Sequence, residues 1–213
     1  MENSLTYKDF IKQIEATGRD KMDGYYPLTL ENIYEWEREE IEDIIWDYFV
    51  NKNDSGLAIF MPKLKKYKGI DALKSKLDTF NIPSGGSVNI AEILYIISNE
   101  KKYLNVINQN YTLSANNYEK VSIVARLSRL AKNGDVYSKL VDIYISDIDK
   151  TNQLSALCGI LWADGYLSDI DNFNEISKKM EFLRMFSVEI AEKRREIIMK
   201  YGSGDFEKYK NLN

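Results

Sequence analysis

The sequence contains no histidine, and it has one cysteine, three prolines and no long apolar run. Without histidine the chain cannot form a Ser-His or Cys-His nucleophile pair, an imidazole general base or an HExxH zinc site. Its single cysteine, Cys158, excludes an internal disulfide and any multi-cysteine metal site, and its apolar surroundings predict a buried, inert thiol. Any catalysis would therefore rest on carboxylates, lysine or tyrosine, and we expect no cofactor.

Targeting signals and a surplus of positive charge are also missing. Nowhere do about eighteen apolar residues follow one another, and the N-terminal MENSLTYKDF has no basic region followed by an apolar stretch. We therefore expect a soluble, unprocessed, cytoplasmic protein with no membrane partner. The formal net charge of −4 disfavours nucleic acid, which requires a surplus of Lys and Arg to displace counterions from phosphate. A basic protein is the better partner.

What the chain does contain is a unit that recurs about every thirty-three residues. A small residue holds the same place in each copy, since Ala58, Ala91, Ala125 and Ala156 are 33, 34 and 31 positions apart. The last three lie in similar apolar runs, VNIAEILYII, VSIVARLSRL and LSALCGILWA. This period is typical of a stacked array, in which each unit completes the core of its neighbour. We expect Ala91, Ala125 and Ala156 to be buried at helix contacts.

The apolar periodicity predicts helices along nearly the whole chain. The expected helices span residues 4–16, 29–53, 54–67, 69–79, 87–98, 101–111, 117–133, 135–147 and 151–164, with further helices up to Gly202. The buried stripe of the second is expected to be Ile41, Ile44, Ile45 and Tyr48. Pro62 should kink the third, because proline removes a backbone donor.

No segment alternates strictly enough to compete as a strand, so the predicted class is all-α. The predicted architecture is an α-solenoid of antiparallel helix pairs, a HEAT-like or armadillo-like superhelix. One domain is expected over residues 1–213. It would comprise an N-terminal helix and connector (1–28), helical repeats (29–167), and C-terminal capping helices with a tail (168–213).

The order GIDALKSKL, VNIAEILYII, KKYLNVINQ, VSIVARLSRL resembles bacterial HEAT-like repeat proteins, whose paired helices read approximately xIPxLxxxL and VxxxAxxAL. The preceding acidic REEIEDIIWDYF is similar to small HEAT-like proteins often encoded beside toxin genes. The resemblance covers residues 28–167 and implies an immunity protein that neutralises a cognate toxin. The aspartate and arginine that often mark the inter-helix turn are missing or displaced, which leaves the repeat subtype open.

The densest charge lies in ENIYEWEREEIEDIIWD, where eight carboxylates have only Arg38 as a local cation. Like charges at helical spacing cost on the order of 0.2–0.5 kcal/mol per pair in an isolated helix. One interpretation is a solvated face neutralised by Lys63, Lys65, Lys66 and Lys68. A second is a surface for a basic partner such as a toxin domain, and a third is a carboxylate metal or acid/base site. The candidate partner-binding residues here are Tyr34, Glu35, Trp36, Glu39, Glu42, Asp43 and Asp47.

The inner face of the array is a second candidate surface. Positions one, four and eight residues after each recurrent alanine share a helical face, and the third such set, Leu157, Ile160 and Asp164, is largely apolar, as if covered by the C-terminal helices or by a partner. The candidate partner-binding residues of the first two sets are Glu92, Tyr95, Arg126 and Arg129. Ordinary packing explains Tyr95 equally well, and pairing with carboxylates of the array explains the two arginines.

Three functions remain open from the sequence. The leading one is a non-enzymatic protein-binding module, specifically an immunity protein. A HEAT-like DNA-repair glycosylase could work without histidine, using an aspartate and tryptophans, but it needs a basic groove. A scaffold that holds two other proteins is the third.

Overall fold

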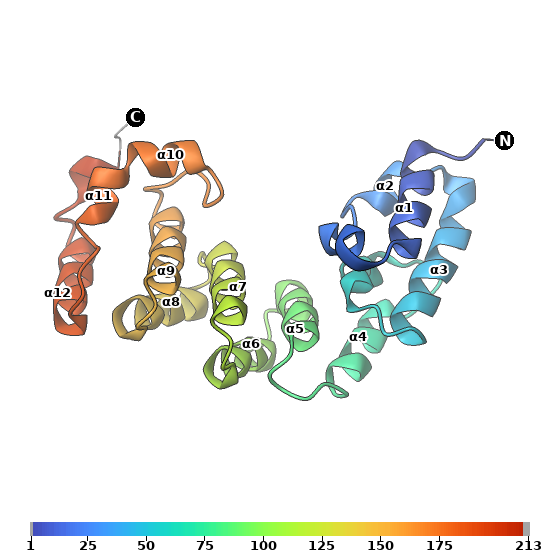
Figure 1. Ribbon diagram of the computed structural model, residues 1–213, viewed down its shortest axis with the longest axis horizontal. Helices are drawn as coiled ribbons and strands as arrows, with labels where there is room; N and C mark the ends of the chain where they lie inside the picture. Colours follow the sequence, from blue (N-terminus) through green and yellow to red (C-terminus); the bar gives the residue numbers. More distant parts are fainter. Residues whose placement is uncertain (1, 211–213) are drawn as a thin grey trace. The chain divides into compact units, whose positions relative to one another are not determined.

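The computed structural model describes residues 2–210, and every regular element within them is a helix (Figure 1). The all-α prediction is therefore confirmed for this part of the chain. Across the same residues, no helix is both long enough and apolar enough to span a bilayer. The chain divides into two compact units, Met1–Leu113 and Ser114–Asn213, each of which is described by itself. The single domain expected from the sequence stays a prediction.

Unit 1 is built around the 3₁₀ segment η3, which packs against α3, α4 and α5. Buried side chains of α3 (Ile41, Ile45, Phe49) meet those of η3 (Leu57, Phe60) to form its core. Helix α6 packs on α5. The elements of unit 1 are α1 (Leu5–Glu15), η1 (Gly18–Asp23), α2 (Thr29–Asn32), η2 (Glu35–Glu37), α3 (Arg38–Val50), η3 (Ser55–Lys63), α4 (Gly69–Leu77), α5 (Gly85–Ser98) and α6 (Lys101–Leu113).

The single helix expected over residues 29–53 is divided in two. Helix α2 ends at Asn32, Ile33 and Tyr34 are extended, and the chain turns through η2 into α3. The buried stripe of α3 consequently follows Ile41, Ile45 and Phe49, while Ile44 and Tyr48 are half-buried on its other side. The predicted stripe was thus half wrong, because the packing of η3 on α3 decides which side of the helix is buried, and the apolar pattern does not show it.

The segment around Pro62 also differs from expectation. It is a 3₁₀ helix that ends at Lys63, where a kinked helix to residue 67 was expected. Its buried residues pack so tightly that a Cβ on Gly69 would lie 1.8 Å from the carbonyl oxygen of Met61. Only glycine fits at that position, which sets the close approach of α4 to η3.

Unit 2 is centred on α9, which packs against both α7 and α8, while α12 packs on α8. Beyond α9 an aromatic cluster forms a second core from Tyr166, Phe182, Phe186, Tyr201 and Phe206. The elements of unit 2 are α7 (Asn117–Arg129), α8 (Gly134–Ser146), α9 (Lys150–Ala163), α10 (Phe173–Lys178), α11 (Met180–Arg184), α12 (Ala191–Gly202) and η4 (Glu207–Tyr209). Helix α7 ends before the expected residue 133 because Asn133 caps α8, accepting a hydrogen bond from the Asp135 N–H.

Of the three alanines predicted to be buried, two are, and Ala58, the first of the recurrent series, is buried as well. Ala58, Ala91 and Ala156 are fully buried, but Ala125 is only half-buried, so its prediction was wrong. Helix α7 instead turns Ser128 toward α9. A Cβ added to Gly159 would lie 2.8 Å from Ser128, and the Ser128 hydroxyl donates to the carbonyl of Ser155 at 2.8 Å. The close approach of α7 to α9 therefore occurs at Ser128 and Gly159.

Candidate functional site

The start of α3 is fixed by a buried carboxylate. Glu37 is fully buried, and its oxygens accept hydrogen bonds from the backbone N–H of Ser4 at 2.7 Å, the Ser4 hydroxyl at 2.7 Å and the Tyr34 N–H at 2.8 Å. Burial alone would raise the pKa of Glu37, but these hydrogen bonds outweigh it and hold that pKa below its usual value. Because Ser4 also caps α1, Glu37 joins the first turns of α1 and α3.

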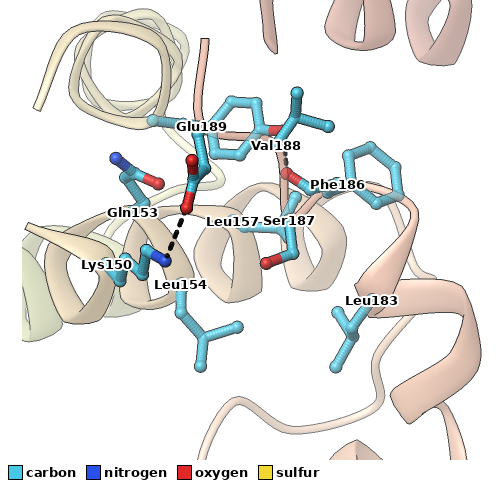
Figure 2. A pocket seen from close by; sticks show the side chains of 10 residues that line it. Lys150, Gln153, Leu154, Leu157, Leu183, Phe186, Ser187, Val188 and Glu189 are labelled. Carbon is cyan, nitrogen blue, oxygen red and sulfur yellow. Dashed lines mark hydrogen bonds and ion pairs between the residues drawn. The ribbon is translucent and has the colours of Figure 1, made fainter. Parts of the chain in front are cut away.

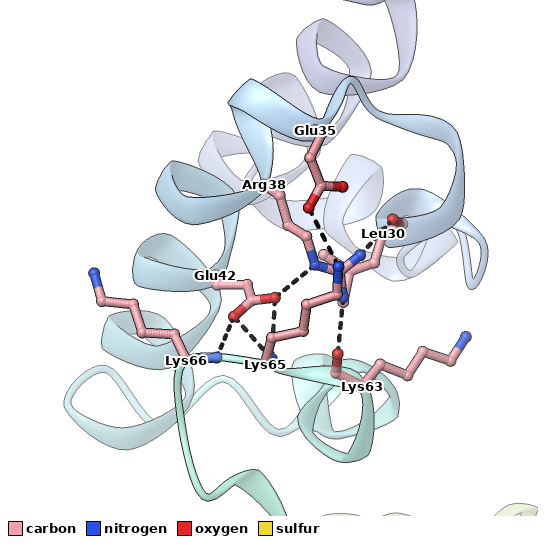
Figure 3. Close-up of polar contacts among 7 residues, drawn as sticks. All are labelled: Leu30, Glu35, Arg38, Glu42, Lys63, Lys65 and Lys66. Atoms are coloured by element: carbon pink, nitrogen blue, oxygen red, sulfur yellow. Dashed lines mark hydrogen bonds and ion pairs between the residues drawn. The ribbon is translucent and has the colours of Figure 1, made fainter.

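A second buried carboxylate holds the following loop against α3 (Figure 3). Glu42 accepts a hydrogen bond from Arg38 Nε at 2.8 Å, and its oxygens also accept from the backbone N–H groups of Lys65 and Lys66. Arg38 in turn donates to the carbonyls of Leu30 and Lys63. The pair therefore connects α2, the end of η3 and the loop after it to α3.

The burial of Glu42 corrects its prediction as a partner-binding residue. Its side chain is 2% exposed and is fully engaged within the chain. The sequence places it among exposed acids at helical spacing, and only the return of the 64–66 loop covers it.

The same loop brings lysines onto the exposed side of the acidic stretch. Lys66 Nζ lies 3.1 Å from a Glu39 oxygen and 2.7 Å from Asp43, while Lys65 lies 3.3 Å from Glu35. Stacking of Tyr67 on Trp46, with ring centres 4.4 Å apart, anchors the end of the loop. The interpretation that lysines neutralise the acidic face is therefore confirmed for these pairs and for the pair of Lys63 with Glu31. Each exposed pair is worth about 0–1 kcal/mol, so a partner's cations can replace it at little cost.

A shallow groove of about 680 Å³ follows the exposed face of α3. We call this surface the α3 face; it consists of Trp36, Glu39, Glu40, Asp43, Ile44, Asp47, Tyr48 and Lys52. At its N-terminal end, the rings of Tyr34 and Trp36 stack with their centres 6.1 Å apart and are 54% and 45% exposed. Exposed aromatic rings of this kind are frequent anchors in protein interfaces.

The α3 face consists of two adjacent rows. Trp36, Glu40, Ile44 and Tyr48 follow at four-residue intervals, and the carboxylates Glu39, Asp43 and Asp47 run beside them.

Most of its charges have partners within the chain. Glu40 accepts a hydrogen bond from the Tyr7 hydroxyl, and Lys52 lies 3.2 Å from Asp47 and 3.5 Å from the centre of the Tyr48 ring. Lys52 and Lys66 pair with three of the four carboxylates, and two positive charges against four negative ones leave a surplus of two formal negative charges.

Comparison with protein-family models, characterised proteins and solved structures finds no match. The α3 face is therefore interpreted from its own chemistry.

The second candidate surface is divided between the two units. Glu92 and Tyr95 lie on α5 in unit 1, and Arg126 and Arg129 lie on α7 in unit 2. Tyr95 is 4% exposed, so it packs in the core of unit 1 and is not a surface residue, which corrects its prediction. Arg129 pairs with Asp171 at 3.1 Å, in agreement with the alternative that it binds a carboxylate of the same protein.

The apolar third set of that surface is covered within unit 2. Leu157 and Ile160 are buried, and Asp164 accepts hydrogen bonds from the hydroxyls of Tyr137 and Tyr201, both at 2.7 Å. Tyr201 belongs to α12, so a C-terminal helix contacts this set at Asp164, in agreement with one of the two expected explanations at that residue.

A small pocket in unit 2 was not predicted from the sequence (Figure 2). Its volume is about 120 Å³, its walls include Leu154, Leu157 and Phe186, and Lys150 and Glu189 pair across its rim at 3.3 Å. Ligand pockets typically occupy roughly 300–1,000 Å³, so this one holds no more than a small group. Its residues come from two distant segments, which no sequence motif connects.

The part of the chain that the structure describes contains neither a candidate metal site nor a reactive thiol. No three carboxylate or thiol side chains gather there in a set that could hold a metal ion. The Cys158 thiol is buried, and burial raises its pKa to about 11, so it stays protonated at neutral pH.

Proposed function

We propose that this chain is a non-enzymatic protein-binding module, most specifically an immunity protein that neutralises a cognate bacterial toxin in the cytoplasm. The observation that carries the proposal is the α3 face, where exposed aromatic rings adjoin a row of carboxylates with surplus negative charge. Tyr34 and Trp36 would provide apolar contact area at the interface. The carboxylates would steer a basic partner toward it.

We further propose that the helices form a HEAT-like superhelix of stacked pairs. Within unit 1, α4 packs against α5, the two members of one expected pair. Within unit 2, α8 packs against α9, and α9 also packs against α7, the second helix of the preceding expected pair. Contacts between second helices of successive pairs are what a stacked array requires. The C-terminal helices would then cap its end.

The test uses the toxin encoded by a neighbouring gene. We expect the purified protein to bind it one to one and to inhibit it at stoichiometric concentration, with an association rate that falls as ionic strength rises. An association rate insensitive to salt would refute the role of the carboxylates. Absence of both binding and inhibition would refute the immunity proposal.

A gel shift with duplex DNA at low salt addresses the glycosylase alternative. We expect no shift, because the surplus charge of the α3 face and of the whole chain is negative. A clear shift would favour the glycosylase over the immunity protein. Simultaneous binding of two unrelated proteins would favour the scaffold.

A further inference from the structure

The two rows of the α3 face define the shape of the element that would cover it. Trp36 of η2 and Ile44 and Tyr48 of α3 form one row with Glu40 among them, and the other carboxylates lie in a row beside it. Apolar and aromatic side chains in a row, with carboxylates among and beside them, are a surface on which another helix can pack. We infer that the α3 face binds a basic amphipathic helix of a partner protein, and that Lys52 competes with this helix for the same site. This inference rests on the proposed function and specifies the partner element.

Charge complementarity selects this occupant over a second copy of the chain. In a two-fold dimer through the α3 face, two surfaces that each carry surplus negative charge would come together, and this like charge opposes association. A helix with apolar residues along one stripe and lysines or arginines beside it would match both rows at once.

Lys52 already makes the two contacts that a lysine of such a helix would make, one with a carboxylate and one with an aromatic ring. It follows the end of α3 and bends back, so that its ammonium lies 3.2 Å from Asp47 and 3.5 Å from the ring centre of Tyr48. An ammonium that contacts a carboxylate and an aromatic face together gains from both interactions. Because both Lys52 and Asp47 are about half exposed, their pairing is weak and a partner's lysine can displace it.

The test uses a synthetic helical peptide with leucines along one stripe and lysines beside it. The control peptide has glutamate in place of every lysine. Binding to the full chain is followed by NMR, through the indole N–H of Trp36, whose signal is assigned with the Trp36→Phe variant. We expect saturable binding of the lysine peptide only. Binding of both peptides, or of neither, overturns the inference.

The competitor is tested with Lys52→Met, which keeps the apolar stem and removes the charge. The matched control is Lys74→Met, which removes the same charge from an exposed position on α4. We expect Lys52→Met to tighten lysine-peptide binding about three- to tenfold, since one weak ion pair and one exposed cation–π contact no longer compete. Equal effects of the two variants would show that only net charge matters and would overturn the role of Lys52.

Binding of the cognate toxin distinguishes failure of the helix inference from failure of the proposed immunity function. If wild-type protein binds and inhibits the toxin while the lysine peptide does not bind, the proposed function stands and the helix inference falls. If the peptide binds as expected and the toxin is not inhibited, the α3 face does recognise a basic helix, but the immunity function is wrong.

Discussion

Glu37 and Glu42 occur in the same acidic stretch as the exposed carboxylates, yet both are buried and hold structure together. Each satisfies backbone N–H groups from a distant part of the chain: Glu37 that of Ser4, Glu42 those of Lys65 and Lys66. A sequence window cannot distinguish them from Glu39, because the groups that bury them lie 23 or more positions away. The sequence therefore identified the acidic surface but could not assign every residue to it.

Replacing Glu42 by alanine should destabilise unit 1 strongly. The change leaves the mostly buried Arg38 without its counter-ion and two backbone N–H groups without an acceptor. Breaking a buried pair in this way costs about 3–5 kcal/mol. The control, Glu39→Ala, removes an exposed carboxylate and should change stability by about 0.5 kcal/mol or less. Urea unfolding measures both, and equal losses would contradict the structural role of Glu42.

Glu37 should contribute to the pH dependence of stability. Its pKa is lowered in the folded state from an ordinary 4.5, so its contribution is complete above pH 4.5 and is lost as pH falls through the folded pKa. Glu37→Gln should therefore be less stable than wild type at pH 7. The difference should narrow as pH falls below 4.5 toward the lowered pKa of the folded Glu37 carboxyl, where wild type begins to protonate it. A difference that stays constant from pH 7 to pH 3 in chemical unfolding would show that the carboxylate charge has no part in it.

At the scale of elements, the apolar pattern predicted where helices exist more reliably than which face each one buries. Residues 87–98 and 151–164 correspond closely to α5 and α9, and their recurrent alanines are buried. In α7, Ser128 makes the close contact with Gly159 in place of the recurrent alanine. Its hydroxyl can be buried there because the carbonyls of Val124 and Ser155 accept hydrogen bonds from it. A serine inside a helix contact depends on these hydrogen bonds, which composition does not reveal.

Gly159→Ala tests that contact between α7 and α9. The new methyl would lie 2.8 Å from Ser128, and overpacking of this kind costs about 1–3 kcal/mol. The gain in helix propensity from glycine to alanine, about 1 kcal/mol, opposes the cost without reversing it in a tight site. Gly134→Ala is the control, because its methyl would meet no atom within 4 Å at the start of α8. We expect a lower melting temperature for Gly159→Ala only. A rise in both variants would mean that the helices can separate freely at Ser128.

At the scale of the whole molecule, the net charge of −4 and the local charge of the α3 face would affect partner binding in different ways. Net charge acts at long range and is screened over about 8 Å at physiological ionic strength. A local row of carboxylates acts on the partner as it docks. Both charges are negative, so either one favours a basic partner, and they differ only in which carboxylates control the association rate.

Two double charge reversals with the same change in net charge separate these claims. Glu39→Lys with Asp43→Lys alters the α3 face, whereas Glu192→Lys with Glu196→Lys alters an exposed pair at the same spacing on α12. We expect the first to slow association with the cognate toxin by about tenfold or more and the second to have a much smaller effect, measured by stopped flow at low salt.

Circular dichroism should show both variants folded, because exposed charge changes usually shift stability by about 0.5 kcal/mol. Since reversal also places new lysines beside Lys66, a moderate loss of stability in the first variant is consistent with the α3 face. Equal slowing by the two reversals would instead assign recognition to total charge and remove the α3 face as the binding surface.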